Sequence, residues 1–125
     1  MIDHVSVPVR DLAKAMAFYD AVLATLGLTR RDTRLATAGY GKKYSEFWIN
    51  ARETMPAPAS DSGHHVCIRA RSTDVVDAFH AAALAAGGHC DGPPGIRPHD
   101  RVRYYAAFVI DPDGNRIEAV TFPKD

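Results

Sequence analysis

The sequence predicts an α+β domain built from two βαβββ modules that are related by pseudo-twofold symmetry. The first observation is an internal repeat: at a separation of 61 positions, His4-Val5 aligns with His65-Val66. The second is that each copy opens with alternating apolar residues and continues with a helical pattern. The third is a strong hairpin signal, Asp111-Pro112-Asp113-Gly114, before the last strand. A strand–helix unit that occurs twice in 125 residues predicts two modules side by side.

The composition is that of one ordinary globular domain, with a first module at 1–52, a linker at 53–62 and a second module at 63–125. Fifteen basic and fifteen acidic residues cancel, which argues against binding to nucleic acid or to a membrane surface. No apolar run approaches the roughly 20 residues that span a bilayer, and no signal-peptide pattern precedes the first strand. We therefore expect a cytoplasmic protein in which Cys67 and Cys90 are free thiols.

The first module opens with a strand over residues 2–9, whose three valines share one face while His4 lies on the other. Asp11 is an N-cap residue type, and the helical spacing that follows it continues to about residue 26, where a glycine ends the helix. Residues 28–50 predict three short strands separated by turns, and 44–50 is the clearest of them.

The second module opens with a strand over residues 63–70, in which His65 lies on the face away from the core. Ser72 is the N-cap residue of a helix that runs to about residue 86. The remaining segments are a loop at 91–101, which contains Gly-Pro-Pro-Gly, a strand at 104–110 and a last strand at 116–122.

The alternation of the strands places three possible metal ligands on corresponding faces. Ile117 and Ala119 share the apolar face of the last strand, so Glu118 lies on the other face, as His4 and His65 do on their own strands. Two imidazoles and one carboxylate suit a divalent ion such as Zn²⁺, Ni²⁺, Mn²⁺ or Fe²⁺. Three protein ligands leave coordination positions open, which is typical of a catalytic metal site.

Other residues on these faces are candidates for the walls of a pocket. Trp48 occupies the place of Glu118 in the first module and is expected to form a wall. Glu46, on the same face, is a candidate fourth ligand or catalytic base. Cys67 shares the face of His65 and is either a pocket thiol or simply a small strand residue, the second being the simpler interpretation.

Two segments near the last hairpin are candidates for substrate binding. Either Tyr104 or Tyr105 is expected to line the pocket, and the strand register needed to choose between them is not fixed by the sequence. The loop at 92–103 is rich in basic residues and ends at Arg103. It is either a lid that recognises a carboxylate or phosphonate or a solvated loop of mixed charge.

These motifs resemble the vicinal oxygen chelate superfamily, which includes glyoxalase I, bleomycin-resistance proteins, fosfomycin-resistance thiol transferases and extradiol dioxygenases. The closing hairpin Asp111-Pro112-Asp113-Gly114-Asn115-Arg116-Ile117-Glu118 is the most specific part of the resemblance. Ile2-Asp3-His4-Val5 and His65-Val66 are similar to the openings of the family's two modules. The resemblance covers essentially the whole chain and is closest to small bacterial members labelled glyoxalase-like.

The resemblance implies sheets that curl into a cup around a divalent metal, with His4, His65 and Glu118 as the ligands. It implies an isomerase, lyase or thiol transferase that acts on a small oxygen-rich metabolite through a metal-chelated enediolate or alkoxide. It also implies a homodimer, whose sites lie within one chain or are shared between two. Glyoxalase I has a fourth ligand, a glutamate, where this chain has Phe47-Trp48, so the ligand count fits the three-ligand members better. The alternative function is non-catalytic binding of a small molecule, as in bleomycin-resistance proteins.

Overall fold

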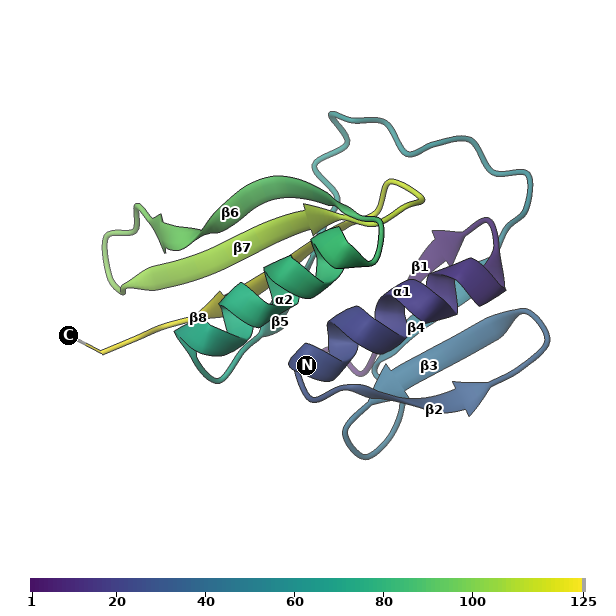
Figure 1. The fold of residues 1–125 in the computed structure, drawn as a ribbon, viewed down its shortest axis with the longest axis horizontal. Helices are drawn as coiled ribbons and strands as arrows, with labels where there is room; N and C mark the ends of the chain where they lie inside the picture. Colours follow the sequence, from purple (N-terminus) through teal and green to yellow (C-terminus); the bar gives the residue numbers. More distant parts are fainter. Residues whose placement is uncertain (125) are drawn as a thin grey trace.

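Two βαβββ modules follow one another along the chain in the computed structural model, which describes residues 1–124 (Figure 1). The first module consists of β1 (Val5–Val9), α1 (Leu12–Thr25), β2 (Thr29–Thr33), β3 (Thr37–Gly41) and β4 (Phe47–Ala51). The second consists of β5 (Val66–Arg69), α2 (Thr73–Ala85), β6 (His89–Arg97), β7 (Tyr104–Ile110) and β8 (Arg116–Thr121). The predicted α+β class and the duplicated architecture are confirmed.

Each module forms its own mixed four-stranded sheet, with the order β1-β4-β3-β2 in the first and β5-β8-β7-β6 in the second. The first and last strands of each module are parallel, and the other pairs are antiparallel. The registers correspond as well: Ser6 is opposite Trp48, and Cys67 is opposite Glu118. The repeat in the sequence is therefore a repeat of topology and of register.

The two helices begin and end where the capping residues predict. The Asp11 side chain accepts a hydrogen bond from the backbone N–H of Lys14 at 3.1 Å, and the Ser72 hydroxyl accepts one from that of Val75 at 3.3 Å. At the other end of α1, Gly27 adopts a φ of +78°, a conformation that favours glycine. Neither helix within the described residues combines the length and the apolar character that a membrane crossing requires.

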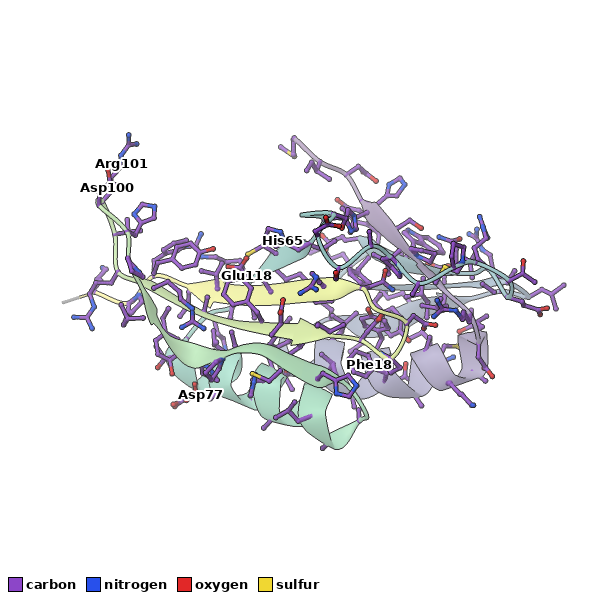
Figure 2. The ribbon with its side chains drawn as sticks, turned by 90° about the horizontal axis from the view of Figure 1, so that it is seen from above. Phe18, His65, Asp77, Asp100, Arg101 and Glu118 are labelled. Atoms are coloured by element: carbon purple, nitrogen blue, oxygen red, sulfur yellow. The ribbon has the colours of Figure 1, made fainter. Side chains whose placement is uncertain are left out.

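Both helices lie on one side of the sheets and pack against each other, so the opposite faces of the two sheets stay uncovered (Figures 1 and 2). The core fills the space between helices and sheets. Its largest fully buried side chains include Tyr19, Tyr40, Phe18, Phe47, Phe79, Leu23, Ile49 and Ile117. Because the core takes the helix-facing residues, the alternating residues on the other face are free to build a site.

One sequence expectation is wrong: much of the segment 91–101, predicted as a loop, belongs to strand β6. The strand lies at the edge of its sheet and pairs only with β7 among the described strands. Its register against β7 shifts twice, between Cys90 and Gly92 and between Gly92 and Gly95. An edge strand with bulges tolerates Pro93 and Pro94 because it needs fewer backbone N–H donors than a central strand does.

A hydrogen-bonded turn connects the two modules. The Asp111 carboxylate accepts hydrogen bonds from the backbone N–H groups of Asp113 and Asn115, at 2.9 and 2.8 Å. Its second oxygen accepts from the buried Tyr19 hydroxyl of α1 at 2.5 Å and from the Asn115 amide at 2.8 Å. The same amide donates to the Pro8 carbonyl of β1 at 2.8 Å. The closing hairpin of the second module is thus fastened to the first strand and first helix of the other.

Burial is the main cause of the altered acidity in this turn. It raises the pKa of Tyr19 well above its ordinary value, with the charge of Asp111 as the second cause. Burial also raises the pKa of Asp111, although the hydrogen bonds from Tyr19 and Asn115 oppose that change. The hydroxyl therefore stays protonated as a donor throughout the neutral range.

We expect Tyr19→Phe to lower the free energy of unfolding by about 1.5–3 kcal/mol, because a buried carboxylate then loses one of its donors. Urea denaturation followed by circular dichroism measures the change. Tyr44→Phe is the matched control, since Tyr44 is exposed and its variant is expected to stay within about 0.5 kcal/mol of the wild type. Equal effects of the two substitutions would contradict a structural role for the turn.

Candidate functional site

The uncovered face of the second sheet brings His65 and Glu118 together (Figure 2). Strand β5 pairs in parallel with β8, so Cys67 lies opposite Glu118, and His65 precedes β5 on the same face. The Nε2 atom of His65 lies 3.1 Å from Oε1 of Glu118. The alternation of the strands therefore correctly predicts that these side chains share a face.

Glu118 is the most unusual residue of this face, because its side chain is only 3% exposed although no element covers the sheet. Its neighbours account for this burial: His65 contacts one carboxylate oxygen, and the Tyr104 hydroxyl of β7 donates a hydrogen bond to the other. A buried carboxylate is costly unless it is paired or binds a cation. Such a group under a half-exposed imidazole is what a metal or proton-transfer site requires.

Two neutral donors adjoin this carboxylate. Partial burial, followed by the negative charge of Glu118, raises the pKa of the Cys67 thiol to about 12. Burial, followed by the hydrogen bond to Glu118, also raises the pKa of the Tyr104 hydroxyl. Both groups therefore remain protonated at neutral pH. They act as hydrogen-bond donors or proton carriers here, and the thiol is a poor nucleophile.

The structure distinguishes between the two tyrosines that the sequence left open. Tyr104 lies on the face of Glu118, with its ring stacked on His99 at a centroid distance of 5.9 Å and edge-on to Phe122 at 5.5 Å. Tyr105 lies on the opposite face, where its hydroxyl donates to Asp77 of α2 at 2.6 Å. Of the two tyrosines, only Tyr104 therefore lies on the face of Glu118.

Cationic side chains surround the same face. The guanidinium of Arg69 lies over the Phe122 ring at 4.5 Å, and that of Arg97 lies over Phe108 at 5.4 Å. Arg103, the basic residue predicted to bind substrate, is exposed immediately before β7. Sequence reasoning did not single out Arg69 or the phenylalanines, although their alternation with core residues is visible in the sequence.

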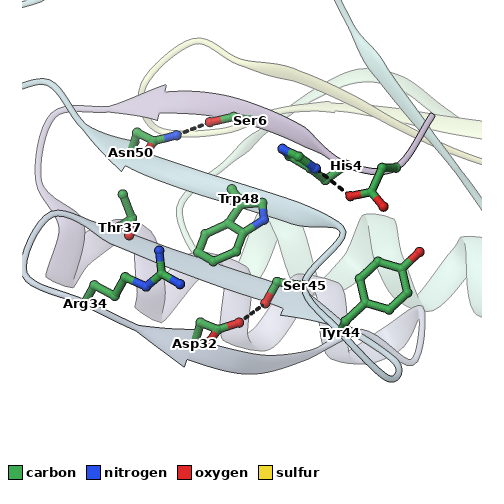
Figure 3. A pocket seen from close by; sticks show the side chains of 10 residues that line it. His4, Ser6, Asp32, Arg34, Thr37, Tyr44, Ser45, Trp48 and Asn50 are labelled. Atoms are coloured by element: carbon green, nitrogen blue, oxygen red, sulfur yellow. Dashed lines mark hydrogen bonds and ion pairs between the residues drawn. The ribbon is translucent and has the colours of Figure 1, made fainter.

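His4 lies on the first module, in a broad hollow above the uncovered face of that sheet (Figure 3). Its Nδ1 atom is 2.7 Å from the Asp3 carboxylate, and its side chain is 56% exposed. Trp48 faces the same hollow from the register position that corresponds to Glu118. The predicted role of Trp48 as a wall is consistent with this position.

Glu46 lies just before β4, outside the strand in which the sequence placed it. It is half-buried and lines a groove of about 510 Å³ at the seam between the modules, together with His4, Cys67 and Lys42. This groove therefore brings candidate residues of the first and the second module together. A role for Glu46 as ligand or base remains a prediction.

One chain therefore supplies two of the three predicted ligands at one point. Among residues 1–124 there is no group of three or more histidine, cysteine, aspartate and glutamate side chains placed to hold a metal ion. His65 and Glu118 offer an imidazole nitrogen and a carboxylate, donors that suit a borderline divalent ion. His4, the third predicted ligand, lies on the uncovered side of the other module.

The sequence was compared with known protein families. A sequence model of the glyoxalase/bleomycin resistance protein/dioxygenase superfamily matches residues 1–119. Among curated proteins, none matches the chain.

The structure has counterparts among solved structures. It is similar to a glyoxalase/bleomycin resistance protein from Albidiferax ferrireducens T118, with a TM-score of 0.84 and 35% sequence identity, covering 97% of this chain and 98% of that one. A glyoxalase/bleomycin resistance protein/dioxygenase family enzyme from Burkholderia phytofirmans PsJN has a TM-score of 0.69 and 20% sequence identity, and the match covers 95% of this chain and 96% of that one. A genomically encoded fosfomycin resistance protein from Listeria monocytogenes has a TM-score of 0.69 and 17% sequence identity, and the match covers 96% of this chain and 91% of that one. The last two likenesses concern the fold alone.

We expect Cys67 to react slowly with a disulfide reagent at pH 8, because a pKa of about 12 leaves only about one thiolate in ten thousand. The rate is expected to rise about tenfold per pH unit up to pH 10. Measuring it in a Cys90→Ser background isolates Cys67. In the same background, Glu118→Gln is expected to accelerate the reaction, since the neighbouring negative charge is removed. A fast reaction at pH 8 in the presence of Glu118 would contradict this account.

Proposed function

The chain belongs to the glyoxalase/bleomycin resistance protein/dioxygenase superfamily, and we propose that it is a divalent-metal-dependent enzyme acting on a small oxygen-rich metabolite. The proposed chemistry is that of an isomerase or lyase, or of a thiol transferase. The single observation that carries the proposal is the nearly buried Glu118 carboxylate held against His65 on an uncovered sheet face. A carboxylate that is buried and held against an imidazole is suited to binding a cation or to transferring a proton, because its negative charge is fixed in place.

We propose that His65 and Glu118 of one subunit hold the ion together with His4 of the partner subunit in a homodimer. Within one chain His4 lies on the other module, yet both modules leave their ligand-bearing faces uncovered on the same side. A twofold dimer that stacks these faces would set the first module of one copy against the second module of the other. Each dimer would then contain two equivalent sites.

The side chains of the site have separate tasks in this proposal. A bound Zn²⁺, Ni²⁺, Mn²⁺ or Fe²⁺ supplies Lewis-acid stabilisation of negative charge on substrate oxygens. The Tyr104 hydroxyl fixes one carboxylate oxygen of Glu118, so that the other faces His65. Glu118, or Glu46 from the seam groove, would move a proton on the substrate. Trp48, Tyr104 and Arg103 would bind the substrate around these groups.

A second candidate function is non-catalytic binding of a small molecule, as the superfamily's bleomycin resistance branch suggests. The observation that favours it is the lack of a complete ligand cluster within residues 1–124. A binding protein needs a hollow with aromatic walls and no aligned ligands, and the hollow beside Trp48 has that character. Metal content distinguishes the two candidates.

Purified without a histidine tag, the wild type is expected to contain about one divalent ion per chain. His65→Ala and Glu118→Gln each remove a proposed ligand and are expected to lower metal affinity at least about tenfold. His89→Ala is the matched control, because His89 is exposed on β6 away from these residues. Elemental analysis and titration calorimetry with each metal measure the effect. A metal-free wild type that binds none of the metals would favour the binding protein.

Mixing His4→Ala with His65→Ala tests whether sites are shared between subunits. Each variant alone is expected to lack metal and activity. After subunit exchange, a mixed dimer of the proposed kind regains one complete site, so about one quarter of all sites should recover. Metal binding and turnover of methylglyoxal with glutathione, or of fosfomycin with a thiol, report recovery. No recovery after verified exchange would show that each site is built within one chain.

A further inference from the structure

The hollow over the first sheet contains a cation, Arg34, to which the proposed function gives no role. It has a volume of about 560 Å³ and lies above the uncovered face of the first module (Figure 3). Polar side chains dominate its lining, and Trp48 and Tyr44 are its aromatic members. A concave site with a few converging polar groups around an aromatic wall is the usual form of a small-molecule site.

Trp48 forms the wall of this hollow because the strand beside it has no side chain at the matching position. Gly39 of β3 pairs with Trp48 of β4 in the register of the sheet. A Cβ atom on Gly39 would collide with the Ser45 side chain and lie 3.0 Å from Cε3 of Trp48. The absence of that atom leaves room for the indole beside the strand, where it lines the hollow.

Arg34 is the cation of the hollow. Its guanidinium carbon lies 5.0 Å from the centroid of the Trp48 ring, in a cation–π arrangement. Arg34 takes part in none of the ion pairs formed within residues 1–124, and its guanidinium makes no hydrogen bond to another described side chain. Stacking fixes the plane of a guanidinium while leaving its N–H groups available at the edge. Arg34 therefore lies over the Trp48 ring and has no anionic partner among residues 1–124.

The acidic groups of the hollow are already engaged. Asp32 accepts a hydrogen bond from the Ser45 hydroxyl at 2.5 Å, and Asp3 contacts His4 at 2.7 Å. The Asn50 amide donates to the Ser6 hydroxyl at the far side (Figure 3). An anion that reaches Arg34 meets hydroxyl and amide groups and also the Asp32 carboxylate, to which a hydroxyl on the same ligand can donate.

We propose that the hollow is a binding site for a small organic oxyanion, a carboxylate or phosphonate. The oxyanion accepts two hydrogen bonds from the edge of Arg34, and the apolar part of the ligand packs on Trp48. The Asp32 carboxylate accepts from a ligand hydroxyl where one is present. His4 and Trp48, which the proposed function uses, line the same hollow, so this inference rests on the proposed function and adds Arg34 as the group that recognises the oxyanion of the ligand.

The only tryptophan of the chain is Trp48, so its fluorescence reports directly on this hollow. Benzoate and phenylphosphonate are the probes, titrated into EDTA-treated protein, and benzamide is the neutral control of similar shape. Saturable changes of emission are expected with both anions and not with benzamide. Because the attraction is ionic, the affinity is expected to fall as salt rises.

Arg34→Gln is expected to weaken binding of both anions roughly tenfold or more, because the charge-assisted hydrogen bonds are lost. Arg31→Gln is the matched control, since Arg31 lies exposed on β2 and donates to the Lys42 carbonyl instead. Gly39→Ala should also weaken binding, by displacing the indole. Circular dichroism checks that each variant is folded.

Three outcomes would overturn the proposal: no saturable change with either anion, equal binding of benzamide, or unchanged affinity in Arg34→Gln. Glu118→Gln separates this proposal from the metal site. Unchanged anion binding in that variant, with metal binding lost, shows that Arg34 recognises the anion without the metal and supports the proposal. Anion binding that disappears with Glu118 would assign the anion to the second module and refute a site at Arg34.

Discussion

The hydrogen bonds around Asp111 are the constraint on which the arrangement of this protein depends. Two βαβββ modules could pack in many relative orientations, because apolar packing such as that between α1 and α2 is not directional. Directional bonds from Tyr19 and to Pro8 select one orientation, since they require the closing hairpin to meet the first strand and helix. The Arg10–Asp113 ion pair, at 3.2 Å, adds to the same junction. Both uncovered faces then lie on one side of the molecule.

The chemistry of the second module follows from strand register. A parallel pairing of β5 with β8 places Cys67 beside Glu118, and the antiparallel pairing of β7 brings the Tyr104 hydroxyl to the same carboxylate. A shift by one residue would turn Glu118 toward the helix and bury it without these partners. In the first module the corresponding position holds Trp48, so the same register yields an aromatic wall. One scaffold thus carries an acidic group in one half and an aromatic group in the other.

Local patterns were sufficient to predict most of the fold. N-cap residues, valine alternation and the Asp-Pro-Asp-Gly turn each act within a few residues, and the structure confirms the elements they predict. Strand β6 was missed because prolines argue against a strand unless its edge position is known. The pairing of His65 with Glu118 followed from strand parity. Strand parity did not predict that His4 lies apart from that pair, because the position of His4 depends on how the two modules pack. Arg34 was overlooked because its contact with Trp48 arises from a turn between strands.

The prolines of β6 have a consequence for how copies of this chain can associate. Pro93 and Pro94 supply no N–H donors, and two register shifts bend the backbone around them. A neighbouring chain therefore cannot extend the sheet by regular strand addition at this edge, and regular strand addition at exposed edges is a route to fibrous aggregates. The outer edge of the second module is in this way protected against uncontrolled growth of the sheet by its own sequence.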